Sequence, residues 1–162
     1  MNCLALTRCI DFMRRRNFHS TKNIEWKDTK PYIPPVNSGL VIKVYDGDTI
    51  TIATQIYNDK TLYRFSVRLN GIDCPEMKTN NNNEKTVAIM AKNRVTEMIY
   101  RKNITLKNVK KEKYGRLLAD VYHNNICINN VLLKERLAVK YDGGTKIVPK
   151  DWMDFHINNN IN

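Results

Sequence analysis

The sequence has few cysteines, a shortage of acids and no long apolar run. Its four cysteines, Cys3, Cys9, Cys74 and Cys127, lack both the short paired spacing of a zinc site and the density of a small disulfide-linked secreted domain. We therefore expect free thiols in a reducing, intracellular compartment. No apolar run approaches the ~18 residues that a membrane span requires, so we expect no membrane partner. The 162 residues suffice for one core but not for two, which predicts one domain with tails. We also expect a monomer.

Positive charge dominates the chain. Lys and Arg number 27 against 16 Asp and Glu, which gives a formal net charge of +11. Residues 1–22 hold five basic residues and one acid, so residues 23–162 still carry +7. Such a surface favours polyanionic partners, and nucleic acid is the obvious one.

The first 22 residues are rich in arginine and poor in acid. They combine a short apolar stretch, four arginines, hydroxyl residues and the single acid Asp11. This composition is typical of an organellar transit peptide, and the run RRRNFHST resembles the pattern near processing sites of mitochondrial presequences. The alternative is a basic tail that adds affinity for nucleic acid by charge alone. We expect mitochondrial targeting, with the basic tail as the competing interpretation.

Proline and asparagine mark the edges of the predicted domain. Residues 23–39 contain three prolines, and their PYIPPVNSG stretch is typical of an extended linker. We expect the domain over residues 40–148. Residues 149–162 are expected to form a short C-terminal tail, because the closing HINNNIN is of low complexity.

The first half of the domain predicts strands followed by a helix. LVIKVYDGDTITIATQI indicates a hairpin that turns at Asp46 and Gly47, and LYRFSVRLNG indicates a third strand that ends at Gly71. EKTVAIMAKNRVTEMIYRK has apolar residues at helical spacing, which predicts an amphipathic helix.

The second half predicts two or three more strands and a short helix. NITLKNV alternates, and RLLADVYHNNICIN indicates two segments around Asn124 and Asn125. NNVLLKERLA indicates a helix with Asn129 or Asn130 as N-cap. This order predicts a mainly β protein with α-helices (α+β), a five-stranded barrel of the oligonucleotide-binding (OB) type with two to three packed helices. A split α+β sheet fits the same order.

Acids and arginines gather at the predicted strand ends. Asp48 begins the second strand, whereas Asp73 and Glu76 follow the third. Taken singly, each fits an ordinary turn or a surface ion pair. If strands two and three are neighbours in a small barrel, the carboxylates converge on one rim, which is unfavourable without a cation. Arg68 and Arg116 supply the positive charge that an anionic phosphate requires.

Three motifs, YDGDT, RLNGIDCPE and EKYGR, occur in this order and resemble the thermonuclease family of staphylococcal-nuclease-like domains. The likeness runs from about residue 40 to about residue 142. It implies a five-stranded OB-fold barrel and a Ca²⁺-dependent nuclease that hydrolyses DNA and/or RNA and leaves 3′-phosphate ends. The alternative is a catalytically inactive nucleic-acid-binding module on the same fold, because domains of this family in larger proteins often lose their acids.

The resemblance implies a metal site built from four residues. Asp48 and Asp73 fall at the positions of the carboxylate ligands of Ca²⁺, with Asp46 nearby as an outer-sphere partner. The family uses the backbone carbonyl at the position of Cys74, so a cysteine in place of the family's usual threonine leaves that ligand in place. Two carboxylates, a carbonyl and waters match the oxygen ligands that Ca²⁺ prefers.

The resemblance also implies catalytic and substrate-binding residues. Glu76 falls at the position of the general base, and Arg68 and Arg116 fall at positions that clamp the scissile phosphate. The expected substrate contacts are Lys113, Tyr114 and Tyr141. Two departures from the family are visible: the loop MKTNNNNEK is shorter than usual, and the chain after Asp142 offers at most a turn or two where members often have a long helix.

Overall fold

The structure is a computed structural model that describes residues 23–58 and 60–161. The chain divides into two units, residues 1–31 and residues 32–162. In the first unit, a short 3₁₀ helix, η2 (Trp26–Asp28), is capped by a hydrogen bond from the Glu25 N–H to Asp28 Oδ2 at 3.1 Å. The predicted transit peptide, residues 1–22, lies outside the described residues.

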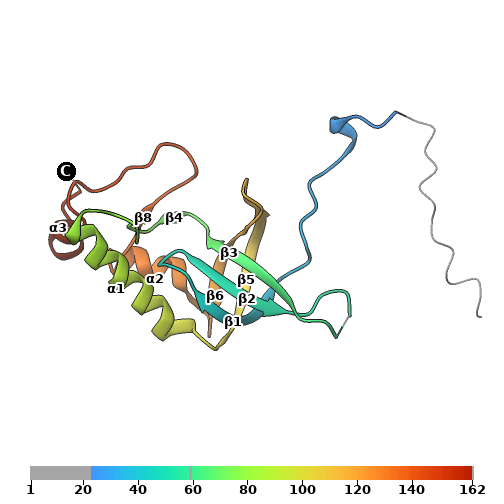
Figure 1. Cartoon of the computed structure of the whole chain (residues 1–162), viewed down its shortest axis with the longest axis horizontal. Helices are drawn as coiled ribbons and strands as arrows, with labels where there is room; N and C mark the ends of the chain where they lie inside the picture. Colours follow the sequence, from blue (N-terminus) through green and yellow to red (C-terminus); the bar gives the residue numbers. More distant parts are fainter. Residues whose placement is uncertain (1–22, 59, 162) are drawn as a thin grey trace, which may run out of the picture. The chain divides into compact units, whose positions relative to one another are not determined.

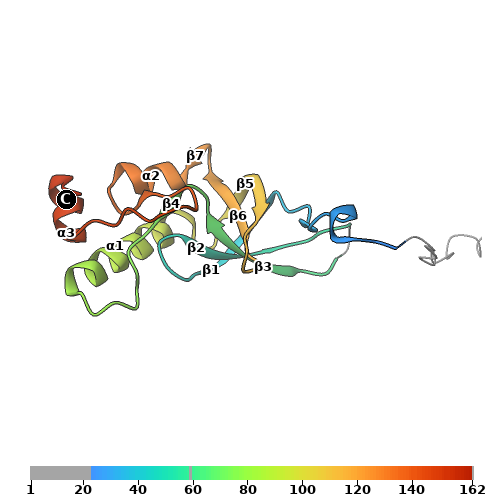
Figure 2. The same cartoon turned by 90° about the horizontal axis from the view of Figure 1, so that it is seen from above.

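The second unit is built around a closed barrel of five strands (Figures 1 and 2). The strands are β1 (Ser38–Val44), β2 (Thr49–Thr54), β3 (Tyr63–Leu69), β5 (Asn103–Lys111) and β6 (Leu117–His123). Neighbours pair antiparallel except β3 and β6, whose parallel pairing closes the barrel. This architecture confirms the predicted OB-type barrel and excludes an open split sheet.

Apolar residues at every second position of the strands point into the barrel and fill it with branched side chains. Ile50 and Ile52 of β2 and Val67 and Leu69 of β3 are fully buried, as the period of two predicts. The hairpin turn between β1 and β2 depends on Gly47, because a Cβ there would lie 2.7 Å from the Ala91 Cβ and 2.8 Å from the Cys74 Sγ. The turn therefore packs directly against Ala91 and Cys74.

Three short strands lie outside the barrel circuit. β7 (Ile126–Cys127) extends the sheet beyond β6. β4 (Ile72–Asp73) pairs antiparallel with β8 (Val139–Lys140), far along the chain. The N–H of Tyr141 also donates to the Gly71 carbonyl at 3.1 Å. This pairing brings the segment from residue 139 onward to the rim at which β3 ends.

Three helices pack at one end of the barrel, as Figure 1 shows: α1 (Asn82–Ile99), α2 (Ile128–Lys134) and α3 (Trp152–Asn158). The predicted amphipathic helix is confirmed as α1, which buries Val87, Ala91 and Val95 at i, i+4 and i+8. The side chain of Asn81 caps α1 by accepting the N–H groups of residues 83 and 84. Across the described ranges, no helix is long and apolar enough to cross a membrane.

The C-terminal segment contains α3. Trp152 and Phe155 of this helix are buried, and α3 packs against α1. The Asn83 Nδ2 of α1 donates to the Asp151 Oδ2, the residue that caps α3, at 2.7 Å. The turn or two of helix that the sequence indicated in this short tail is therefore present as α3, and its aromatic residues belong to the core.

Asn129 has a different role from the predicted one. The helix α2 begins one residue before it, with Cys127 as N-cap, so the prediction that Asn129 or Asn130 caps this helix is wrong. Asn129 is buried instead, where its Oδ1 accepts the Val121 N–H at 3.0 Å and its Nδ2 donates to the Asn70 carbonyl at 2.8 Å. The Asn129 side chain thus provides hydrogen-bond partners for a backbone N–H of β6 and for the backbone carbonyl of the residue that follows β3.

We predict that Asn129→Ala lowers the free energy of unfolding by about 1–3 kcal/mol, because it leaves buried backbone groups without partners. Asn130→Ala is the matched control, since Asn130 is exposed on the same helix and should change stability by less than about 0.5 kcal/mol. Urea unfolding of both variants measures the difference. Equal stabilities would contradict the structural role of the Asn129 amide.

Candidate active site

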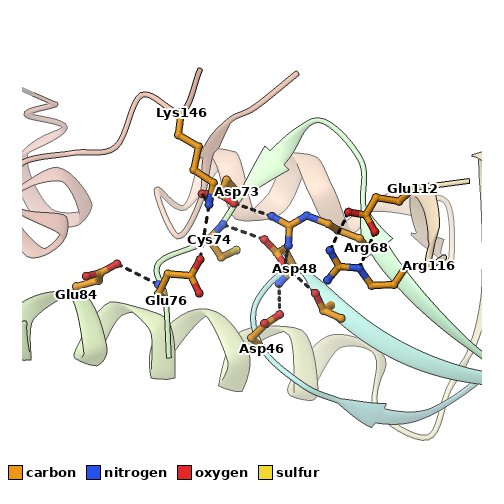
Figure 3. Close-up of polar contacts among 11 residues, drawn as sticks. Asp46, Asp48, Arg68, Asp73, Cys74, Glu76, Glu84, Glu112, Arg116 and Lys146 are labelled. Atoms are coloured by element: carbon orange, nitrogen blue, oxygen red, sulfur yellow. Dashed lines mark hydrogen bonds and ion pairs between the residues drawn. The ribbon is translucent and has the colours of Figure 1, made fainter. Parts of the chain in front are cut away.

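Strand pairing brings the acidic and basic motif residues to one rim of the barrel. Thr49 of β2 lies opposite Arg68 of β3, and the Leu69 N–H donates to the Asp48 carbonyl at 2.8 Å. Gly71 adopts a φ of +76°, so the chain turns there and returns Asp73 of β4 to the same rim. The predicted convergence of Asp48 and Asp73 is therefore present in the structure (Figure 3).

Arg68 bridges the two aspartates. Its Nη1 contacts the Asp48 Oδ1 at 2.8 Å, and its Nη2 contacts the Asp73 Oδ1 at 2.6 Å. Both carboxylates are buried, with only 3 % of each residue exposed. A guanidinium presents its donors in a planar fork, so Arg68 fixes the spacing of the two acids.

The surroundings of Asp48 perturb its carboxyl group. Burial raises the pKa of Asp48 to about 7, although Arg68 acts to lower it, and the nearby charge of Asp46 raises it further. The Thr49 hydroxyl donates to its Oδ1 at 2.9 Å, and the Cys74 N–H donates to its Oδ2 at 3.2 Å. Negative charge at Asp48 is thus only partly compensated by the protein's own donors.

The donor set on this rim fits a hard cation. Asp48 and Asp73 present carboxylate oxygens from adjacent strand ends, and the Cys74 carbonyl belongs to the next residue of the chain. The Oδ1 of Asp46 accepts the Asp48 N–H at 3.2 Å, which places Asp46 beside Asp48. Oxygen donors of this kind are those that Ca²⁺ prefers. In the described part of the chain, no group of three or more His, Cys, Asp or Glu side chains that could hold a metal ion is found.

Glu76 lies at the outer edge of the rim. Its side chain is 68 % exposed, on the loop between β4 and α1. Lys146, from the segment after β8, places its Nζ 3.0 Å from the Asp73 Oδ2 and 3.6 Å from the Glu76 Oε1. Burial acts to lower the pKa of Lys146, but the hydrogen bond and charge of Asp73 raise it above its usual value. Sequence reasoning missed Lys146, because no motif marks it and only the β4–β8 pairing delivers it.

Arg116 joins the rim from the turn between β5 and β6. Its Nε and Nη2 contact the two oxygens of Glu112 at 3.0 and 3.1 Å. The hydrogen bond from Arg116 lowers the pKa of Glu112, and the same bond raises that of Arg116. Glu112 was also missed from the sequence, although its place four residues before Arg116 is a spacing that permits such a pair.

A cavity of about 260 Å³ adjoins Arg68 and contains two of the three predicted substrate contacts. Lys113 and Tyr141 line it, together with Glu112. Tyr114 does not line the cavity. This residue is 73 % exposed, and the Lys113 Nζ lies 4.9 Å from the centre of its ring. The structure therefore brings Lys113 and Tyr141 to one pocket and leaves Tyr114 on the open surface beside it.

Comparison with known proteins identifies the family. Residues 66–151 match the model of the family described as staphylococcal nuclease homologue, which is the class that the barrel and rim define. This chain belongs to that family. The matched segment does not include Asp48 of the YDGDT motif. In the structure, the ion pair with Arg68 joins Asp48 to the matched segment.

Three curated relatives are 34 % identical to the chain. An uncharacterized endonuclease of Haemophilus influenzae matches over 105 residues, or 65 % of this chain and 53 % of its own length. Endonuclease YncB of Bacillus subtilis matches over 118 residues, 69 % of this chain and 53 % of its length. The SPbeta prophage-derived endonuclease YokF of Bacillus subtilis matches over 112 residues, 65 % of this chain and 36 % of its length. The chain thus spans about half the length of the first two relatives.

We predict that Arg68→Met lowers the free energy of unfolding by about 3–5 kcal/mol, because two buried carboxylates lose their shared counter-ion. Arg94→Met is the matched control, since Arg94 forms a similar forked pair with Glu135 at a more exposed position and should lose about 1 kcal/mol or less. Urea unfolding in the presence of a chelator measures both. Similar losses in the two variants would show that the bridge does not hold the rim together.

Proposed function

We propose that the chain is a nuclease that hydrolyses phosphodiester bonds of DNA and/or RNA with Ca²⁺. By the family resemblance, we expect it to leave 3′-phosphate ends. The observation that carries the proposal is the Arg68 bridge between Asp48 and Asp73, which gathers paired carboxylates and a guanidinium on one rim. The endonuclease names of the three relatives support the same activity.

Asp48 and Asp73 would hold the ion, with the Cys74 carbonyl as a third ligand and Asp46 orienting Asp48. These donors suit Ca²⁺ because they are oxygen atoms and because the charge on Asp48 is incompletely balanced within the protein. The chemistry supplied by a bound Ca²⁺ is positive charge next to the phosphate oxygens on which negative charge develops.

Arg68 and Arg116 are proposed to donate hydrogen bonds to the scissile phosphate. The contacts of Arg116 with Glu112 use Nε and Nη2, so its Nη1 is available to a phosphate oxygen. Fixed donors of this kind stabilise a transition state without reorganising during the reaction. The adjoining cavity lined by Lys113 and Tyr141 would receive the neighbouring nucleotide, while Tyr114 offers an exposed ring for stacking.

Glu76 is proposed to act as the general base. Its exposure gives its carboxylate direct access to water, from which it would accept a proton as the water attacks phosphorus and the bond from phosphorus to the departing 5′ oxygen breaks. The ammonium of Lys146 lies between Glu76 and Asp73 and reduces the repulsion that these acids exert on an approaching phosphate.

The competing interpretation is an inactive nucleic-acid-binding module on the same fold. The net charge of +7 over residues 23–162 suits either function. The presence of Asp48, Arg68, Asp73, Glu76 and Arg116 favours the nuclease, because binding alone does not require an acid cluster amid basic charge.

We predict that Glu76→Gln lowers turnover by about 10² or more, because it removes the base while keeping the size of the side chain. Oligonucleotide binding should change little. Glu97→Gln, a matched change at an exposed residue of α1, should cut like the wild type. Cleavage of a labelled single-stranded oligonucleotide at saturating Ca²⁺ measures all three proteins. Equal cleavage by wild type and Glu76→Gln would overturn the base assignment, and a wild type inactive with any divalent metal would support the binding module.

We predict that Asp46→Asn and Asp48→Asn weaken Ca²⁺ binding by different amounts. Asp46→Asn should raise the Ca²⁺ dissociation constant by about tenfold, the size expected for a residue that only orients a ligand. Asp48→Asn should raise it further, because it removes a charged ligand. Calorimetric titration of the protein with Ca²⁺ gives both constants, and an Asp48→Asn variant that binds as tightly as wild type would contradict the assigned site.

A further inference from the structure

Glu84, in the first turn of α1, bonds at two points to the loop that carries Glu76. Its Oε1 accepts the backbone N–H of Glu76 at 3.1 Å, and its Oε2 accepts the Thr79 hydroxyl at 2.6 Å. Figure 3 shows the Glu84 carboxylate directed from α1 toward Glu76. Both oxygens of Glu84 therefore hold the loop.

This arrangement differs from the usual role of an acid at this helix position. Glu84 stands three residues after the N-cap Asn81, where an acid commonly bonds back to the N-cap N–H to form a capping box. Here the Asn81 N–H instead donates to the Thr79 Oγ1 at 3.2 Å. Glu84 therefore does not bond to the N–H of the N-cap residue. It accepts instead the N–H of Glu76, which lies five residues before Asn81 in the chain.

Apart from Pro75, the rest of the loop contributes little to fixing Glu76. Pro75 is buried and restricts the backbone just before Glu76. After that point the Glu76 side chain is largely exposed, and its contact with Lys146 is a 3.6 Å ion pair between solvent-accessible groups, which is weak. The bond from the Glu76 N–H to Glu84 therefore ties this residue to α1, whose Val87, Ala91 and Val95 are fully buried.

We propose that Glu84 is a positioning residue, which fixes the backbone of Glu76 relative to the barrel rim so that the Glu76 carboxylate meets the attacking water. This inference rests on the proposed function. The physical reason is that a general base acts only when held in a narrow range of geometry, and a displacement of about 1 Å can lower the rate by about 10².

The test compares Glu84→Ala, Glu84→Gln and Thr79→Val with Glu97→Ala, which removes a carboxylate from the other end of the same helix. Two quantities are measured: cleavage kinetics of an oligonucleotide with Ca²⁺, and hydrogen exchange of the Glu76 amide by NMR. Glu84→Ala should lower kcat by tenfold or more with KM within about twofold, and should speed exchange of the Glu76 amide by tenfold or more. Glu97→Ala should match wild type in both.

The other two variants separate positioning from folding. Glu84→Gln keeps an oxygen that can accept the Glu76 N–H, so it should restore amide protection and most of kcat. Thr79→Val keeps the charge and the bond to Glu76, and should give an intermediate loss. If Glu84→Ala cuts like wild type, or if the Glu76 amide exchanges equally fast in both, the proposal is wrong.

The same experiment distinguishes this proposal from the proposed function. A wild type that cuts while Glu84→Ala cuts equally well overturns only the role of Glu84. A wild type that cuts nothing overturns the nuclease and with it the catalytic part of this proposal. In that case, an unchanged exchange rate of the Glu76 amide in Glu84→Ala would also show that the Glu84 bond does not fix the Glu76 backbone. A faster exchange rate would show that the bond fixes this backbone but has no catalytic role.

Discussion

The ion pairs of Arg68 with Asp48 and Asp73 are the interaction on which the site depends. The two aspartates are buried and lie 25 residues apart in the chain. They reach the same rim because β2 begins, and β3 and β4 end, at that rim. Without a shared cation, their charges would repel in a medium that screens poorly. The guanidinium between them makes the convergence possible, and a guanidinium is also the group that we propose binds the phosphate.

The rim combines a rigid side with an exposed side. Asp48, Arg68 and Asp73 are fixed by strand pairing and by contacts to buried backbone. Glu76 and Lys146 instead come from segments outside the barrel and are largely or partly exposed. This division suits the proposed hydrolysis, in which the phosphate and its counter-charges would be held still while water reaches Glu76. It also accounts for proposing the Glu84 contact as a positioning device for the exposed Glu76 rather than for the buried acids.

Local patterns predicted the parts of the molecule that depend on short-range order. Alternation in β2 and β3 and helical spacing in α1 gave the barrel strands and the main helix, and the motif order gave Asp48, Arg68, Asp73 and Arg116. Contacts made through long-range pairing were not predictable. Lys146 reaches the site only through the β4–β8 pairing, and Asn129 was mistaken for a cap because its partners lie on β6 and at the end of β3.

A crystal structure with Ca²⁺ and a non-cleavable nucleotide carrying a phosphate tests the central claim most directly. The account predicts one cation bound by Asp48, Asp73 and the Cys74 carbonyl, with phosphate oxygens within hydrogen-bonding distance of Arg68 and Arg116. It also predicts the Glu76 carboxylate on the side of the phosphate that faces water. A phosphate bound elsewhere on the barrel, with Arg68 still bridging two aspartates that bind no cation, would contradict the account.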